Sequence, residues 1–290
     1  STLVAQFLTL LYLVVASKAW EYFSVKRIQP KVFKRVSTHS IALIPNNLAW
    51  WVVNASDRTI IAHFLGTAAN GIYSIANKFP NVFINFYNIL NLSWTETVSL
   101  HYGDEDRDEF LTETMTSLFK LFAAACFGIV ACMPFIFPIL INTKYDAAYN
   151  QILILMYAML FRVLVGLYSC VYVAQKNAKK IAYTSISAAI INITVDLILI
   201  NKIQVFAASV STLVAFLSMF VIRYIDVNKT VHMKIRKPII VGSVLIGGML
   251  IGTYYCGNKI IQFVALCITA IYAMLTNVDM LKSGVNLVKS

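Results

Sequence analysis

Residues 46–58 read Asn46-Asn47-Leu48-Ala49-Trp50-Trp51-Val52-Val53-Asn54-Ala55-Ser56-Asp57-Arg58, and they lie inside an apolar stretch that runs from Ile41 to Phe64. This stretch is predicted to be a membrane-spanning helix, because about 20 largely apolar residues cross a bilayer. An Asp or Arg at the middle of a bilayer costs roughly 2.5–3.5 kcal/mol on insertion scales. Three Asn residues and an adjacent Asp-Arg pair in one span therefore predict that one side of this helix faces a bundle interior or a water-filled cavity.

The composition of the whole chain agrees with a membrane protein. Of 290 residues, 59% are hydrophobic and only 13% are charged, whereas soluble domains carry about 25% charged residues. We predict an all-α polytopic membrane helix bundle with about nine transmembrane helices. The candidate spans are 2–22, 41–64, 72–100, 115–141, 151–173, 181–200, 205–225, 239–256 and 260–276.

The basic residues decide the predicted orientation. The net charge is +11, which by itself would also suit a nucleic-acid-binding protein. With nine spans, however, most of these charges fall on one side of the membrane, and only Lys144, Lys202 and Lys259 fall on the other. The positive-inside rule places the basic side in the cytoplasm and explains the charge without nucleic acid. The basic side collects Lys26, Arg27, Lys31, Lys34, Arg35, Arg107, Lys176, Lys179, Lys180, Arg223, Lys229, Lys234, Arg236, Lys237, Lys282 and Lys289.

A stripe of polar residues runs along the third predicted span, which is the least hydrophobic of the nine. Its members recur at steps of three or four residues and therefore share one helix face. Such Asn residues can be interhelical hydrogen-bond partners worth about 0.6 kcal/mol each, or they can line a hydrated cavity. Six Asn with Lys78 and Glu96 beside them favour the cavity. The stripe comprises Asn70, Ser74, Asn77, Asn81, Asn85, Asn88, Asn91 and Thr95.

Other polar groups give weaker signals. Arg162 and Asp196 lie within later spans, and each is either paired structurally or part of a substrate path. The five cysteines form no C-x-x-C pair, and the four histidines have no metal-ligand spacing. We find no nucleophile–base pair and no Gly-rich phosphate loop. The sequence therefore predicts a protein that is not an enzyme and that binds no cofactor and no metal. Any transport would run on an ion gradient or on substrate consumption.

Two segments carry a resemblance to a known family. The first contains Pro45–Trp51 and Asn54–Arg58, and the second contains Phe64-Leu65-Gly66 and Asn70-Gly71-Ile72-Tyr73-Ser74-Ile75-Ala76-Asn77-Lys78-Phe79-Pro80. Together with Asn91-Leu92-Ser93-Trp94-Thr95-Glu96, they resemble the polysaccharide transporter family. These are O-antigen and capsule oligosaccharide flippases of the multidrug/oligosaccharidyl-lipid/polysaccharide exporter superfamily.

The resemblance implies a domain organisation. Such flippases have two six-helix lobes, often followed by two extra helices. Residues 1–23 would be the last helix of the first lobe, 24–40 a cytoplasmic linker, 41–225 the second lobe, and 226–290 two extra helices and a tail. The chain begins at Ser1 without an initiator Met, so we expect a piece of a longer protein that lacks five helices. Asp196 stands where the resemblance implies a neutral polar residue.

The resemblance also implies a function: flipping of an undecaprenyl-pyrophosphate-linked oligosaccharide across the bacterial cytoplasmic membrane by alternating access. The expected partners are this substrate, membrane lipids, and a glycan polymerase or other assembly proteins. Cations would bind the pyrophosphate, acids would neutralise them or bind a coupling H⁺ or Na⁺, and amides would line the cavity. The cations are Arg58, Lys78 and Arg162; the acids are Asp57, Glu96 and Asp196; the amides are Asn46, Asn47, Asn54, Asn77, Asn81, Asn85 and Asn88.

Three rival functions are weighed against this one. A drug–cation antiporter of the same superfamily would need net acid in its cavity, whereas the predicted charges nearly balance. A glycan polymerase would need a large external loop, and the predicted external loops are very short. A scaffold for glycan assembly that transports nothing stays open. Within the favoured function, Asp57 and Arg58 fall near the external end of their span, with Lys78 expected beside them.

Overall fold

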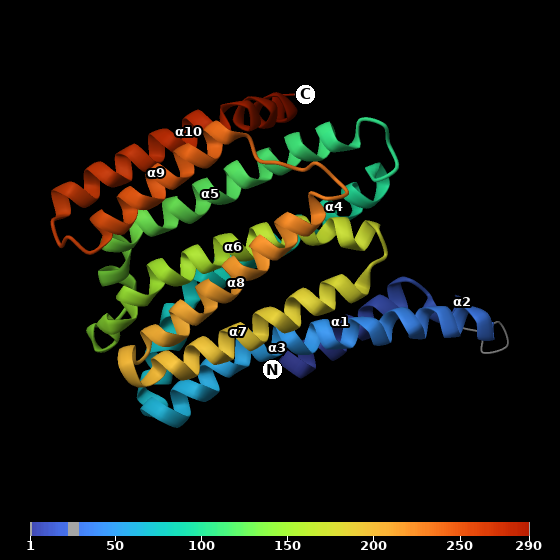
Figure 1. The fold of residues 1–290 in the computed structure, drawn as a ribbon, viewed down its shortest axis with the longest axis horizontal. Helices are drawn as coiled ribbons and strands as arrows, with labels where there is room; N and C mark the ends of the chain where they lie inside the picture. Colours follow the sequence, from blue (N-terminus) through green and yellow to red (C-terminus); the bar gives the residue numbers. More distant parts are fainter. Residues whose placement is uncertain (1, 23–28, 290) are drawn as a thin grey trace. The chain divides into compact units, whose positions relative to one another are not determined.

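The computed structural model describes residues 2–22 and 29–289, and within them all regular structure is helical. The chain divides into two compact units, Ser1–Ala42 and Leu43–Ser290. Figure 1 traces the order of the helices along the chain. The two units are described separately below.

The first unit holds two short helices and the start of a long one. Helices α1 (Thr2–Ala16) and α2 (Ala19–Tyr22) replace the single span predicted over residues 2–22, because Lys18 takes a positive φ of 48° between them. Part of the predicted linker is also helical, since α3 (Pro30–Ala76) starts at Pro30. Proline is well suited to a first helical turn, where its missing N–H has no partner to lose. Residues 23–28 of the predicted linker lie outside the described residues.

The second and third predicted spans meet at a break inside α3. Gly66 has φ 87° and ψ 173°, a backbone conformation that only glycine adopts readily. The third span then continues into α4 (Lys78–His101), since the N–H groups of Asn77 and Asn81 bond the carbonyls of Tyr73 and Asn77 at 3.1 and 2.9 Å. The irregular join at residue 77 follows from Pro80, which has no N–H to donate to the carbonyl four residues earlier.

Five more elements complete the predicted second lobe: α5 (Arg107–Leu140), the 3-10 helix η2 (Thr143–Ala148), α6 (Tyr149–Ala174), α7 (Ala178–Ile203) and α8 (Phe206–Val227). Helix α6 is central, with 16 of its 26 residues buried, and it contacts α4, α5, α7 and α8 (Figure 1). The small residues at the start of α8 are fully buried, and Ser209 donates to Gln151 of α6 at 2.6 Å. Small side chains therefore let these two helices approach closely.

The last two predicted spans correspond to α9 (Lys237–Tyr254) and α10 (Lys259–Lys289), which pack on α5 and on each other (Figure 1). Among the residues that the structure describes, six helical segments are long and apolar enough to cross a membrane: α5, η2 with α6, α7, α8, α9, and residues 259–278 of α10. Of the nine predicted spans, the first three fall short by this criterion, because α1 is short and because α3 and α4 carry the polar residues noted above. The fold is a polytopic all-α membrane bundle.

The structure buries Arg223, which the sequence analysis counted among the basic residues of the cytoplasmic side. This side chain lies within α8 and is only 1% exposed. Its guanidinium donates to Thr184 at 3.0 Å and to Ser185 at 3.2 Å, both on α7, and to Ser169 on α6. Hydroxyl groups from neighbouring helices satisfy the buried cation, so α8 can continue past it to Val227.

Candidate functional site

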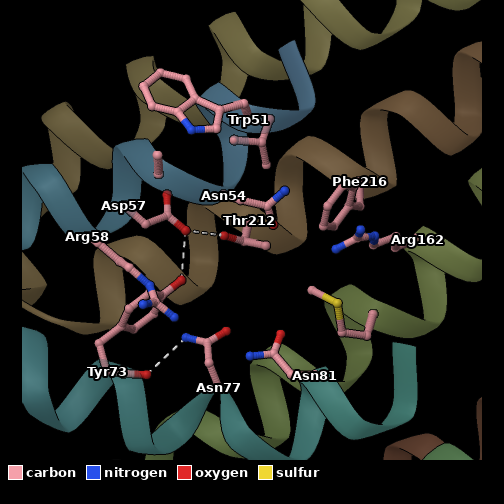
Figure 2. Close-up of a pocket in the computed structure, with 13 residues that line it drawn as sticks. Trp51, Asn54, Asp57, Arg58, Tyr73, Asn77, Asn81, Arg162, Thr212 and Phe216 are labelled. Carbon is pink, nitrogen blue, oxygen red and sulfur yellow. Dashed lines mark hydrogen bonds between the residues drawn. The ribbon is translucent and has the colours of Figure 1, made fainter. Parts of the chain in front are cut away.

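A polar cavity of about 390 Å³ opens between α3, α4, α6 and α8. Its walls come from the middle of α3, the join before α4, and the centres of α6 and α8, as Figure 2 shows. The stretch with which the sequence analysis began therefore forms one wall, and the start of the Asn stripe forms another. The lining residues are Trp51, Val53, Asn54, Ala55, Asp57, Arg58, Tyr73, Asn77, Asn81, Met159, Arg162, Thr212 and Phe216.

Asp57 is the buried acid of this cavity. Its side chain is 3% exposed, and its Oδ2 accepts hydrogen bonds from Tyr73 Oη and Thr212 Oγ1, each at 2.7 Å (Figure 2). Its Oδ1 has no hydrogen-bond partner among the described residues. The two hydroxyls fix the carboxyl group between α3 and α8 but leave one oxygen free to accept a proton or a cation.

A second acid, Asp196 of α7, lies within electrostatic range of Asp57. It is 0% exposed, and neither of its carboxyl oxygens is hydrogen-bonded within the described part of the chain. Asn192, one turn earlier, accepts from Ser56 at 3.0 Å and donates to Ser211 at 3.2 Å, which ties α7 to α3 and α8. Of the four carboxyl oxygens of Asp57 and Asp196, only Asp57 Oδ2 accepts a hydrogen bond within the described residues. Two such acids within electrostatic range of each other in an apolar bundle need a proton or a bound cation.

Two guanidinium groups supply the positive charge. Arg58 is exposed at one side of the cavity, and Arg162 enters it from α6 (Figure 2). The Arg162 guanidinium carbon lies 4.9 Å from the centroid of the Trp50 ring and 5.8 Å from that of Phe216. Within the described ranges, neither arginine forms an ion pair at contact distance. Aromatic faces therefore position Arg162 while its N–H groups stay available.

The predicted polar stripe divides among three environments. Asn77 and Asn81 line the cavity together with Asn54 of α3. Asn85 and Asn88 are exposed further along α4. Asn91 instead accepts from Tyr87 at 2.7 Å and faces α6, which is the packing role that the sequence left open.

Several predicted site residues lie outside the cavity lining. Lys78 and Glu96 are exposed on α4, so the structure does not bring Lys78 beside Asp57 and Arg58 in the cavity wall as expected. The helix turns Lys78 away because it neighbours Asn77, which faces inward. Asn46 accepts from Ser185 of α7 at 2.7 Å, a contact between helices. Asn47 is exposed, and Asp196 is buried outside the cavity lining.

Sequence reasoning missed Tyr73, Thr212, Met159 and Phe216. Tyr73 stands one turn before Asn77 on the same face, so the stripe itself contained a signal for it. Thr212 and Phe216 are ordinary residues of an apolar helix, and their own sequence gives no sign of the acid or the arginine that they contact.

Comparison with known proteins identifies the family. The MatE family model matches residues 42–198, which is more than half of the chain, so the chain belongs to the MatE family. No curated protein and no solved structure matches it. Members of the family are membrane transporters of the exporter and flippase type rather than enzymes. The chain is therefore a multi-pass membrane transporter. The family match covers α3 from residue 42 onward, α4, α5, α6 and most of α7.

Proposed function

We propose that this MatE-family chain serves to flip an undecaprenyl-pyrophosphate-linked oligosaccharide across the bacterial cytoplasmic membrane by alternating access. The observation that carries the proposal is the charge of the cavity lining. Two arginines face one aspartate, so an anionic substrate is favoured there. The pyrophosphate would bind between Arg58 and Arg162, since a guanidinium matches phosphate oxygens in a planar fork.

The amides suit the sugar part of this substrate. Asn54, Asn77 and Asn81 offer donors and acceptors at the cavity wall. Trp51 adds an aromatic ring on the α3 side, across the cavity from Asn77 and Asn81 (Figure 2). The exposed amides of Asn85 and Asn88 extend the polar surface along α4. An oligosaccharide needs such a hydrogen-bonding path, because its hydroxyls would otherwise lose water without replacement.

An apolar groove supports a lipid-linked substrate. A groove of about 720 Å³ is lined by α5, α6, α8 and α9, with Phe161 and Phe220 in its wall. The neighbouring Arg162 of α6 and Phe216 of α8, one turn from Phe220, line the polar cavity instead. The same helix pair thus offers a polar site on one side and an apolar one on the other, which suits a molecule with a charged head and a hydrocarbon tail.

Ion coupling is assigned to the acids. Asp57 and Asp196 would bind H⁺ or Na⁺, with Asn192 and Thr212 holding the helices around them. One charge moved through 100 mV supplies about 2.3 kcal/mol, enough to bias the direction of flipping. Glu96, exposed on α4, would neutralise cations only at another stage of the cycle.

The alternative is a drug–cation antiporter, which the buried acids Asp57 and Asp196 favour. Deletion of the gene distinguishes the two functions. A flippase deletion would remove the surface glycan and accumulate the lipid-linked precursor in the inner leaflet, with drug susceptibility unchanged. Normal surface glycan together with increased susceptibility to cationic drugs would overturn the proposal. Lipid-linked precursors are extracted and quantified by mass spectrometry.

A further inference from the structure

A second pocket lies where α7 begins and α8 ends. It has a volume of about 540 Å³. Three lysines and one aspartate line it, which leaves a net charge of +2. Lys179 lies in the first turn of α7, where the N-terminal end of the helix adds positive potential. The charged lining residues are Lys179, Lys180, Lys229 and Asp226.

The negative charge in this pocket is already compensated. Asp226 Oδ2 accepts from Lys180 Nζ at 2.7 Å and from Tyr172 Oη at 2.9 Å. Among the described residues, neither the Lys179 nor the Lys229 ammonium group forms an ion pair at contact distance or a side-chain hydrogen bond, and Lys229 acts on Asp226 only at longer range. Both side chains are exposed. Two ammonium groups therefore remain available to an external anion.

The remaining wall of the pocket is apolar. Tyr183 is 70% exposed and Ile225 is 54% exposed, and Ile222 lies beside them in the lining. Large apolar side chains at the end of a transmembrane helix pair face lipid chains, with tyrosine at the level of the headgroups. The predicted orientation puts this end of α7 and α8 at the cytoplasmic face.

We propose that this pocket binds one anionic glycerophospholipid of the inner leaflet. The phosphate sits between Lys179 and Lys229, and the acyl chains lie along Tyr183, Ile222 and Ile225. Charge complementarity selects the headgroup, since basic pockets between transmembrane helices on the cytoplasmic side attract anionic lipids. The site is independent of the transported substrate and holds α7 and α8 together at the end opposite the acid pair.

The test compares lipid binding to the full chain purified in neutral detergent. Native mass spectrometry follows binding of phosphatidylglycerol and of phosphatidylcholine. We expect preferential binding of phosphatidylglycerol, and about 30-fold weaker binding to Lys179→Gln/Lys229→Gln, which corresponds to about 1 kcal/mol per lysine. The matched control Lys144→Gln/Lys202→Gln removes two exposed lysines predicted to lie on the opposite side and should bind as the wild type does.

Three results would overturn the proposal. One is equal binding of both lipids by the wild type. Another is unchanged phosphatidylglycerol binding in a Lys179→Gln/Lys229→Gln variant whose thermal midpoint matches that of the wild type. The third is displacement of phosphatidylglycerol by an equal concentration of inorganic phosphate at constant ionic strength, since a lipid site also needs the chains. Because neither variant changes the cavity lining, the result is separable from the proposed transport function.

Discussion

At the residue scale, the cavity holds its positive and negative groups in different ways. Arg162 is positioned by the rings of Trp50 and Phe216, whereas Asp57 is held by two hydroxyls. A cation placed on aromatic faces keeps its N–H groups free for a ligand. A carboxylate that accepts two hydrogen bonds on one oxygen keeps the other oxygen free. Arg162 therefore has N–H groups open to an anion, and Asp57 has an oxygen open to a proton or a cation, in the lining of one cavity.

The anion site is tested by alanine substitution. Because hydrogen bonds to charged groups contribute about 1.5–3 kcal/mol each, Arg58→Ala and Arg162→Ala should each reduce glycan export at least about 10-fold. Lys78→Ala is the matched control, since it removes an exposed cation outside the cavity lining. Export is measured as surface glycan per transporter in the membrane. Equal losses in all three variants would mean that Lys78 acts in the path, and the geometry of the anion site would be wrong.

The cation site is tested by Asp57→Asn and Asp196→Asn. An Asn at residue 57 still accepts from Tyr73 and Thr212 but carries no charge, so the fold should persist while ion dependence disappears. One uncoupled charge at 100 mV lowers the accumulation ratio by as much as about 50-fold, or about 2.3 kcal/mol. Transport is followed in vesicles under imposed H⁺ and Na⁺ gradients. Asp146→Asn is the control, since this residue of η2 is exposed. Retained gradient dependence in both test variants would exclude the acids as the coupling site.

At the element scale, the break in α3 depends on one glycine. Gly66 has φ 87° and ψ 173°, and a side chain in that region costs about 1–3 kcal/mol. Gly66→Ala should therefore lower the thermal midpoint of the detergent-solubilised protein, although no atom lies within 4 Å of the added Cβ. Gly71→Ala, equally unobstructed but helical, should be neutral or stabilising by up to about 1 kcal/mol. Equal midpoints for the two variants would contradict a strained hinge.

The break near Gly66 and the helical course of the third span were predictable, because apolar length and the spacing of Asn residues report directly on helix extent and face. What each helix face contacts could not be predicted. Periodicity places Asn77, Asn81 and Asn91 on one side of a helix, but the neighbouring helix decides whether an amide meets a cavity or another side chain. The burial of Arg223 was not predicted for the same reason, since hydroxyl groups supplied by α6 and α7 make it tolerable.

At the scale of the whole molecule, the proposals share one orientation. The cavity is lined by the part of α3 that precedes Gly66 and by Thr212 and Phe216 in the first half of α8, on the side that the positive-inside rule places toward the outside. The lipid pocket lies where α7 begins and α8 ends. The acid pair therefore lies near one end of α7 and α8, and the lipid pocket lies at the other end of these two helices. Inversion of the chain in the membrane would put the lysine pocket in the outer leaflet.

Cysteine labelling in intact cells tests this orientation. Cys256 is exposed between α9 and α10, on the predicted external side, whereas Cys126 and Cys170 are buried. A membrane-impermeant maleimide should label Cys256 without permeabilisation, because its side chain is exposed on the predicted external side. In a Cys256→Ser background, Gly103→Cys between α4 and α5 should be labelled only after permeabilisation; its Cβ meets no atom within 4 Å, so the substitution is unobstructed. The reverse pattern would place the basic side outside and contradict both the direction of flipping and the inner-leaflet lipid site.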